Sequence, residues 1–397
     1  MSLPISQRVQ RVKPSPTVAL TGRVAQLKAE GKDIISLGAG EPDFDTPQHI
    51  ADAGVEAIRK GFTRYTALEG NADLKDAIIA KFKRENGLEY KRSQILVSSG
   101  AKQTIFNLIL ALIDPGDEVI IPAPYWVSYP DMVLLAGGVP VTPYGGPDQG
   151  YKITPTQLEL AITPKTRLFI LNSPSNPTGA AYTRAELRAF GDVLARHPNV
   201  AICTDDIYEH IYWADEPFAS FAAVCPELYD RTITVNGVSK AHAMTGWRIG
   251  FCGGPTEIVT AMATIQGQST SNASSIAQKA AVAALNGDQT CVRQMNEQFK
   301  RRHDFLVEGL NKLPGVSCLP GAGTFYAFAN IEGAMKLMGA KDDTAFAEQL
   351  LHGGVAVVPG SGFGAPGHMR LSFACSMETL EEALRRMDRV LKEAQAA

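Results

Sequence analysis

The chain has 397 residues, of which 45% are hydrophobic and 20% charged, and its formal net charge is −3. This composition is typical of a folded protein of two or three domains, and it excludes the basic surface with which nucleic-acid-binding proteins hold phosphates. The apolar stretch at residues 105–113 is too short to cross a bilayer, and the N-terminus lacks the apolar core of a signal peptide. We therefore expect neither nucleic-acid nor membrane partners.

Taken in chain order, short apolar strand patterns alternate with helical patterns over roughly residues 45–280. Because each strand pattern is almost continuously apolar, we expect α/β architecture, with a mostly parallel sheet covered by helices on both faces. The predicted strands are residues 95–98, 118–121, 167–171, 200–203 and 232–235, and the helices between them include residues 103–113 and 184–197.

The last hundred residues change pattern and predict a smaller α+β domain. We expect three parts: an N-terminal segment, residues 1–44, which packs on the small domain, a large domain, residues 45–285, and a small C-terminal domain, residues 286–397. The predicted elements of the small domain are a helix at residues 294–312, short strands at 324–328, 355–358 and 368–373, and a final amphipathic helix at 377–394.

Six cysteines are dispersed along the chain, and no Cys-x-x-Cys pair occurs. This usage favours a reducing compartment, so we expect a cytoplasmic protein. The cysteines and the seven histidines have no metal-ligand spacing, and we predict no metal.

Lys240 lies in the loop after the predicted strand 232–235, beyond an Asn-Gly turn signal at residues 236–237. Open α/β sheets bind ligands at the carboxyl ends of their strands. A lysine amine forms a Schiff base with a carbonyl, and an arginine such as Arg248 suits a phosphate. The pair predicts pyridoxal phosphate, which carries both groups. Alone, two such cations would more often be solvated, so this hypothesis depends on partners elsewhere in the chain.

Two such partners follow other predicted strands. Asp205 and Asp206 come after strand 200–203, where a carboxylate can keep a pyridine nitrogen protonated, although a helix N-cap is the alternative interpretation. We choose Asp205 because Tyr208, three residues on, can then reach the same ring. Asn176, in the turn-rich stretch 172–179, is expected to present its amide to the ring hydroxyl oxygen.

Residues 98–103, Ser-Ser-Gly-Ala-Lys-Gln, lie between a predicted strand and a predicted helix. Their small side chains let backbone N–H groups approach a phosphate at the helix N-terminus. Trp126 has the flat surface to stack on a ring, although most tryptophans simply pack in cores.

Together these stretches resemble the aspartate aminotransferase family of fold type I pyridoxal-phosphate enzymes. The resemblance spans nearly the whole chain, and the order and number of its motifs make it specific. The matching motifs are residues 39–47, Tyr65, residues 99–103, 125–126, 172–179, 205–208, 239–240, 245–248 and 370–373.

The resemblance implies a catalytic role for Lys240, which would hold the cofactor and carry the proton to and from the substrate Cα. Asp205 would hold the proton of the ring nitrogen. Arg370 would bind the substrate α-carboxylate as a two-pronged fork, helped by Gly40 and Asn176.

Further cofactor contacts are implied by the same resemblance. Tyr208 and Asn176 would reach the ring oxygen, and Trp126 would stack on the ring. Tyr65 would reach the phosphate of the neighbouring subunit, which implies a homodimer with shared active sites. The remaining phosphate-binding residues would be Gly100, Ala101, Lys102, Arg248 and Ser239, the last in place of a serine that many relatives carry where this chain has Gly237.

The expected substrate depends on which residue binds the second carboxylate of a dicarboxylic amino acid. The chain has no arginine in residues 266–272, where one branch of the family uses one, and it resembles the branch in which Lys102 binds that carboxylate. Ser15 and Thr17 would close over the substrate. We therefore expect aspartate aminotransferase activity, with small-molecule amino acids and 2-oxo acids as its partners.

Three alternatives stay open. A prephenate or aromatic aminotransferase would use the same motifs, and a fold type I lyase shares the lysine, the aspartate and both arginines. A regulatory binding protein on this fold would turn over no amino acid. Lys102 and the Tyr125-Trp126 pair favour transamination.

Overall fold

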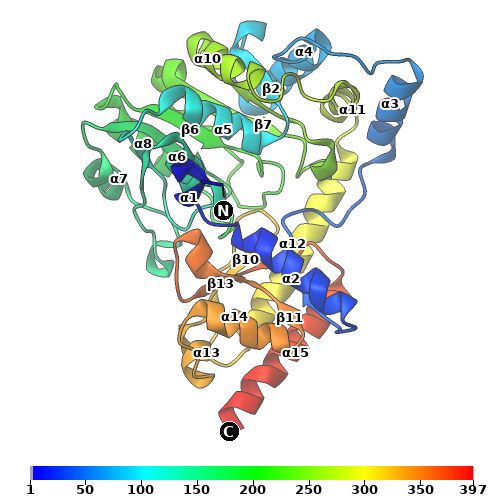
Figure 1. The fold of residues 1–397 in the computed structure, drawn as a ribbon, viewed down its shortest axis with the longest axis vertical. Helices are drawn as coiled ribbons and strands as arrows, with labels where there is room; N and C mark the ends of the chain where they lie inside the picture. Colours follow the sequence, from blue (N-terminus) through cyan, green and yellow to red (C-terminus); the bar gives the residue numbers. More distant parts are fainter. Residues whose placement is uncertain (1–2, 397) are drawn as a thin grey trace.

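The computed structural model describes residues 3–396, and its centre is a seven-stranded, mostly parallel sheet between layers of helices (Figure 1). The strand order is β2-β8-β7-β6-β5-β3-β4, and β8 runs antiparallel to both of its neighbours. The predicted fold class is confirmed. The strands are β2 (Ile95–Ser98), β3 (Glu118–Ile120), β4 (Val139–Val141), β5 (Thr166–Asn172), β6 (Ala201–Asp205), β7 (Thr232–Gly237) and β8 (Gly250–Gly253).

Both faces of this sheet are buried, which explains the continuous apolar character of its strands. Successive side chains of a strand point to opposite faces. Leu96 packs in the cluster on one face and Val97 in the cluster on the other, and both are fully buried. The face on the side of Leu96 is covered by α5 (Ala101–Leu112), α6 (Ser128–Ala136) and α10 (Thr256–Gly267). The opposite face is covered by α4 (Ala72–Lys81), α8 (Arg184–Ala195), α9 (Phe221–Val224) and α11 (Ser275–Asn286). Helix α3 (Gln48–Arg59) packs against α11.

The C-terminal part forms a second layer of sheets and helices, into which the long helix α12 leads (Figure 1). A four-stranded antiparallel sheet has the order β12-β13-β10-β9, and β1 from the N-terminal part pairs with β11. The elements are β1 (Ile35–Ser36), β9 (Ser317–Cys318), β10 (Tyr326–Asn330), β11 (Val355–Ala356), β12 (Val358–Pro359), β13 (His368–Ser372), α12 (Thr290–Leu310), α13 (Glu332–Leu337), α14 (Asp343–His352) and α15 (Met377–Ala396).

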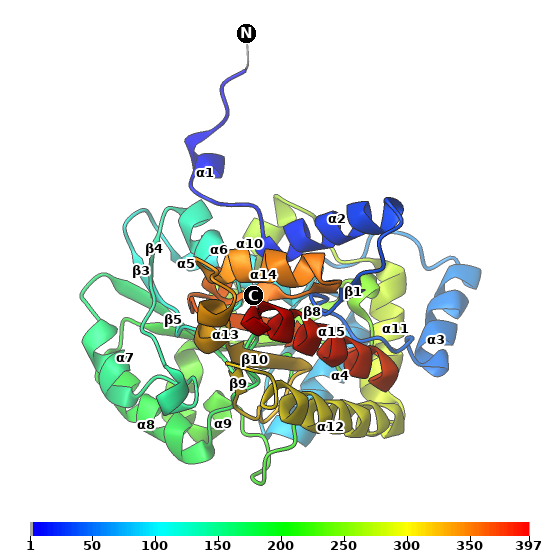
Figure 2. The same ribbon diagram turned by 90° about the horizontal axis from the view of Figure 1, so that it is seen from below.

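The N-terminal helices behave differently from each other. Helix α1 (Gln7–Gln10) lies on the N-terminal stretch that projects in Figure 2 and contacts α6, whereas α2 (Pro16–Ala29) lies against the C-terminal part. Val24 and Leu27 of α2 pack with Leu351 and Ala356. Helix α2 therefore packs on the C-terminal part.

Two local predictions were wrong. The turn expected at residues 236–237 is the end of β7, because Asn236 and Gly237 pair with Phe251 and Gly250 of β8. The single strand expected at residues 355–358 is two strands, β11 and β12, which pair in different sheets. Sequence periodicity cannot reveal such distant pairing partners.

No helix within residues 3–396 combines the length and apolar character needed to cross a membrane.

Candidate active site

A cavity of about 650 Å³ lies at the carboxyl ends of the central strands. Its size is within the range of small-molecule sites, and its place is the one that open α/β sheets use for ligands. Asn172 ends β5, Asp205 ends β6 and Lys240 follows β7. Segments from both ends of the chain complete the wall, including residues 38–41 and Arg370.

Most residues that the sequence singled out meet in this cavity. Those that line it are Gly40, Ala101, Lys102, Trp126, Asn176, Asp205, Tyr208, Ser239, Lys240, Arg248, Arg370 and Thr17. Gly100, Ser15 and Tyr65 are not part of the lining.

The Lys240 amine is half-buried and donates a hydrogen bond of 2.5 Å to the carbonyl oxygen of Gly40. Burial lowers the pKa of Lys240 to about 8, and the guanidinium groups of Arg370 and Arg248 act in the same direction. A substantial fraction of the amine is therefore neutral near pH 7.5. The neutral amine is the form that attacks a carbonyl.

Asp205 is the buried acid of the cavity. Its carboxylate accepts hydrogen bonds from the Tyr129 hydroxyl, at 2.6 Å, and from the Ile207 N–H, at 3.4 Å. Burial raises the pKa of Asp205 to about 6, although these hydrogen bonds oppose the rise. Asp206 instead accepts a hydrogen bond from Ser220 at 2.7 Å and does not line the cavity. The geometry favours Asp205 over its neighbour.

Arg370 is buried and held from two sides. Its Nη1 donates to Oδ1 of Asn176 at 2.9 Å, and its Nη2 donates to the Gly38 carbonyl at 3.0 Å. The guanidinium lies 4.3 Å from the centre of the Tyr326 ring. Nε has no hydrogen-bond partner, and both described bonds of the guanidinium go to neutral oxygens. A buried cation in this state attracts a carboxylate.

The start of α5 and Arg248 form an anion cradle. Gly100 precedes the helix with φ of 90°, a conformation that favours glycine, and a Cβ there would collide with the Arg248 guanidinium. That guanidinium donates to the Thr245 carbonyl at 2.9 Å and the Ser99 carbonyl at 3.3 Å. A helix N-terminus beside an arginine suits a phosphate.

Packing against the neighbouring strand explains why residue 237 is a glycine. A Cβ there would lie 3.0 Å from the Ile249 carbonyl oxygen and 3.2 Å from the Cα of Gly250, so a serine would press on the neighbouring strand. Ser239 is buried and lines the cavity.

Lys102 and Thr17 lie where a substrate would enter. The exposed Lys102 ammonium is 4.8 Å from the centre of the Trp126 ring. Thr17, in the first turn of α2, lines the cavity, and its hydroxyl is 2.8 Å from that of Ser15, which stays outside the lining. Tyr65 is 91% exposed and does not line the cavity of its own chain.

Among the residues of the site that were missed as functional candidates are Tyr129, Asn172 and Tyr326. Tyr129 was detectable, because it follows Trp126 by three residues, which places both on one side of a helical turn. Asn172 donates to the Asp205 carbonyl at 2.8 Å and accepts from the Asn176 N–H at 2.8 Å. Tyr326, whose hydroxyl is 3.2 Å from that of Tyr208, comes from a distant strand and had no local signal.

Comparison with known proteins gives concordant matches. The family model "Aminotransferase class I and II" matches residues 32–387. The chain is 58% identical over 394 residues to an aspartate/prephenate aminotransferase of Nitrosomonas europaea, covering 98% of this chain and 99% of that protein. The crystal structure of an aspartate aminotransferase from Rhizobium meliloti has a TM-score of 0.95 at 48% identity, covering 98% of this chain and 99% of that one. The Thermus thermophilus aspartate aminotransferase with maleate has a TM-score of 0.92 at 44% identity, covering 98% and 100%.

Proposed function

Because the chain belongs to the class I and II aminotransferase family, it is a pyridoxal-phosphate-dependent transaminase, and we propose that it transfers the amino group of L-aspartate to 2-oxoglutarate. The products are oxaloacetate and L-glutamate, formed by a ping-pong mechanism. One observation supports the choice of substrate. The cavity is lined by Arg370 and Lys102, two cations in addition to Arg248 of the anion cradle. Aspartate and 2-oxoglutarate each bring two carboxylates.

The residues of the cavity fit pyridoxal phosphate. The cradle at Gly100 and Arg248 suits its phosphate, and the amine of Lys240 lies in the same cavity as the Asp205 carboxylate. When bound, this cofactor supplies an aldehyde for attachment of an amine and a cationic ring that withdraws electrons from the substrate Cα.

We assign the chemistry to residues of this chain as follows. Lys240 holds the cofactor and then moves the proton at the substrate Cα, a task suited to an amine with pKa about 8. Asp205, oriented by Tyr129, keeps the ring nitrogen protonated. Arg370, oriented by Asn176, holds the α-carboxylate. Tyr208 and Asn176 contact the ring oxygen.

The remaining contacts position the ligands. Trp126 would stack on the ring, and Ala101 and Ser239 would add polar groups to the phosphate cradle. Gly40 and Thr17 border the substrate, and Ser15 supports Thr17 through the 2.8 Å contact between the hydroxyls.

Lys102→Ala is expected to lower kcat/KM for aspartate by about 30-fold and to change the value for phenylalanine much less. The loss corresponds to roughly 2 kcal/mol, the lower end for a truncated charge pair, because Lys102 lies at the exposed mouth. Both values are measured with 2-oxoglutarate as acceptor. Lys312→Ala, which removes an exposed lysine that does not line the cavity, is the control. An equal loss for both donors would assign Lys102 to the phosphate or to structure.

A second acceptor, prephenate, is favoured by a specific finding. The relative with 58% identity is named for both aspartate and prephenate. Prephenate also brings two carboxylates, so Arg370 and Lys102 serve it by the same charge matching. A panel of amino donors, each assayed with 2-oxoglutarate, oxaloacetate and prephenate, ranks these substrates. Aspartate with 2-oxoglutarate is expected to be turned over, and its failure beside an active aromatic donor would reject the main proposal.

The protein is expected to be a homodimer in which Tyr65 completes the partner's phosphate site. The 91% exposure of Tyr65 on one protomer supports this arrangement. Hybrids of inactive Lys240→Ala and weakened Tyr65→Phe subunits then contain one site with both wild-type residues. Mixing should therefore raise activity per intact Lys240 above that of Tyr65→Phe alone. No gain in hybrids, or full activity of a monomer, would contradict shared sites.

The domain division at residues 44/45 and 285/286 and a cytoplasmic location complete the proposal. The seven-stranded sheet comes wholly from residues 95–253, and α12 begins at Thr290, which supports the division. All six cysteines are free thiols, which supports a reducing compartment.

A further inference from the structure

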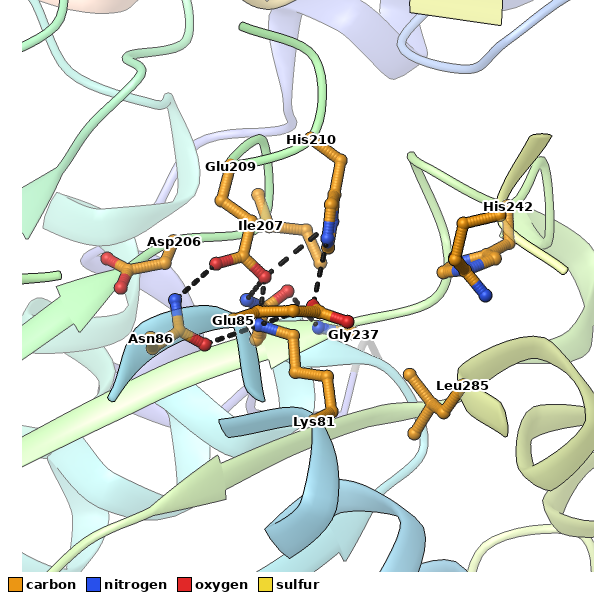
Figure 3. Close-up of polar contacts among 12 residues, drawn as sticks. Lys81, Glu85, Asn86, Asp206, Ile207, Glu209, His210, Gly237, His242 and Leu285 are labelled. Carbon is orange, nitrogen blue, oxygen red and sulfur yellow. Dashed lines mark hydrogen bonds and ion pairs between the residues drawn. The ribbon is translucent and has the colours of Figure 1, made fainter. Parts of the chain in front are cut away.

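A buried polar cluster lies beside the cavity and is not explained by the reaction. Its centre is the Glu209 carboxylate, which forms an ion pair with Lys81 (Figure 3). The side chains of these two residues are 4% and 2% exposed. Glu209 also accepts hydrogen bonds from the amides of Asn86, at 2.6 Å, and Asn236, at 2.7 Å. One carboxylate thus joins three separate segments of the chain.

The first segment has an unusual local shape. Helix α4 ends at Lys81 and continues as a π-helical turn, Phe82–Asn86. Such wide turns are rare and concentrate at functional sites. Here Lys81 and Asn86, at its two ends, both reach Glu209, and the Lys81 ammonium also donates to the side-chain Oδ1 of Asn86 at 2.7 Å.

The other two segments carry the proposed catalytic groups. Backbone pairing of β6 with β7 runs to the bond from the Asp206 N–H to the Val235 carbonyl, at 2.9 Å. Beyond it, the hydrogen bond from the Asn236 amide to the Glu209 carboxylate also links these two segments of the chain. Glu209 directly follows Tyr208 in the sequence, and Asn236 precedes Lys240 by four residues.

The amide of Asn236 is held in one orientation. Its oxygen accepts a hydrogen bond from the Gly237 N–H at 2.8 Å, while its nitrogen donates to Glu209. Any rotation of this amide would break both bonds. The bond therefore adds a side-chain link between the turn after β6 and the end of β7.

The charges argue against a metal ion in this cluster. Oxygen and nitrogen atoms of Glu85, Glu209 and His210 lie within 4.8 Å of one another. The Lys81 ammonium, however, already pairs with Glu209 and is 3.5 Å from Glu85. Burial is the largest single effect on the pKa of Glu209 and acts to raise it, but the charge of Lys81, the neighbouring His210 and the hydrogen bonds from Lys81 and Asn86 together lower the pKa, so the carboxylate is ionised. The ammonium supplies the positive charge that a metal would bring.

We propose that Glu209 is a positioning residue, which through Asn236 holds the loop of Asp205 and Tyr208 at a fixed distance from the loop of Lys240. The inference rests on the proposed function, because it assigns a purpose to the spacing of those three groups. Stability and positioning are separable here: the pair with Lys81 balances a buried charge, whereas the bond to Asn236 sets geometry.

The test compares Asn236→Ala with Asn86→Ala in the holoenzyme. Both variants remove one amide donor from the same carboxylate, but only Asn236→Ala cuts the link to the Lys240 loop. We expect Asn236→Ala to lower kcat for aspartate about tenfold, with KM within twofold, and to alter the visible circular dichroism of the bound cofactor. Asn86→Ala should keep kcat within twofold and an unchanged spectrum. Equal kcat values and spectra in the two variants would overturn the proposal.

A second pair of variants serves if Asn236→Ala does not fold. Lys81→Met with Glu209→Gln removes both charges and keeps an oxygen for Asn236, whereas Lys81→Met with Glu209→Met removes that oxygen as well. The first double variant should retain near wild-type kcat and spectrum, and the second should lose about tenfold in kcat. Equal behaviour would reject a positioning role. Wild-type protein that does not transaminate aspartate would reject the proposed function instead, and the cofactor spectra would still test Glu209.

Discussion

Lys240→Ala is expected to lower kcat for aspartate and 2-oxoglutarate by at least roughly 10⁴-fold. General acid–base catalysis alone contributes about 10²–10⁴-fold, and this substitution also removes the amine that attaches the cofactor. The proton at the substrate Cα is then left without the base that the structure places in the cavity. Steady-state kinetics of the purified variant, loaded with the cofactor, measures the loss.

The comparison variant for Lys240 is Lys102→Ala, which removes the other lysine of the cavity and is expected to cause a much smaller loss with aspartate than Lys240→Ala does. Borohydride treatment of the wild-type holoenzyme should attach the cofactor irreversibly to the peptide that contains Lys240. Attachment at any other lysine, or substantial turnover by Lys240→Ala, would contradict the assignment.

The second large effect is expected for Asp205. Asp205→Asn keeps the size of the side chain and a partner for the Tyr129 hydroxyl, but it removes the negative charge that stabilises a protonated ring nitrogen. We expect kcat to fall by about 10²–10³-fold, the loss typical of one preorganised electrostatic group. KM should change far less, because the charge acts mainly in the transition state.

Asp206→Asn is the matched control for this prediction. Asp206 is equally buried and adjacent in sequence, but its carboxylate accepts a hydrogen bond from Ser220 instead of lining the cavity. Its loss should affect stability more than kcat. A larger kcat effect for Asp206→Asn than for Asp205→Asn would reverse the assignment of the two acids.

The central sheet was predictable because its strands are buried on both faces and are therefore continuously apolar, as residues 168–171 illustrate. The same logic could not place the end of β7. Asn236 and Gly237 have the composition of a turn, yet they pair with β8. This pairing forms only when the chain folds, so a local sequence pattern does not reveal it. Tertiary contact here outweighs local preference.

The site was predictable where residues follow strand ends, as Lys240, Asp205 and Asn176 do, and where a family resemblance supplied a role, as for Arg370. Tyr326 and Glu209 lacked both signals. Tyr326 meets Tyr208 across 118 residues of sequence, and Lys81 meets Glu209 across 128. Such partners are set by packing between distant elements, which a local pattern does not encode.

The most direct test of the proposed transamination is a half-reaction of the holoenzyme with L-aspartate in the absence of any oxo acid. The account predicts that one oxaloacetate forms for each Lys240-containing site, that turnover then stops, and that 2-oxoglutarate restarts it with formation of L-glutamate. Continued release of ammonia or pyruvate without an acceptor, or no oxaloacetate at all, would contradict the account.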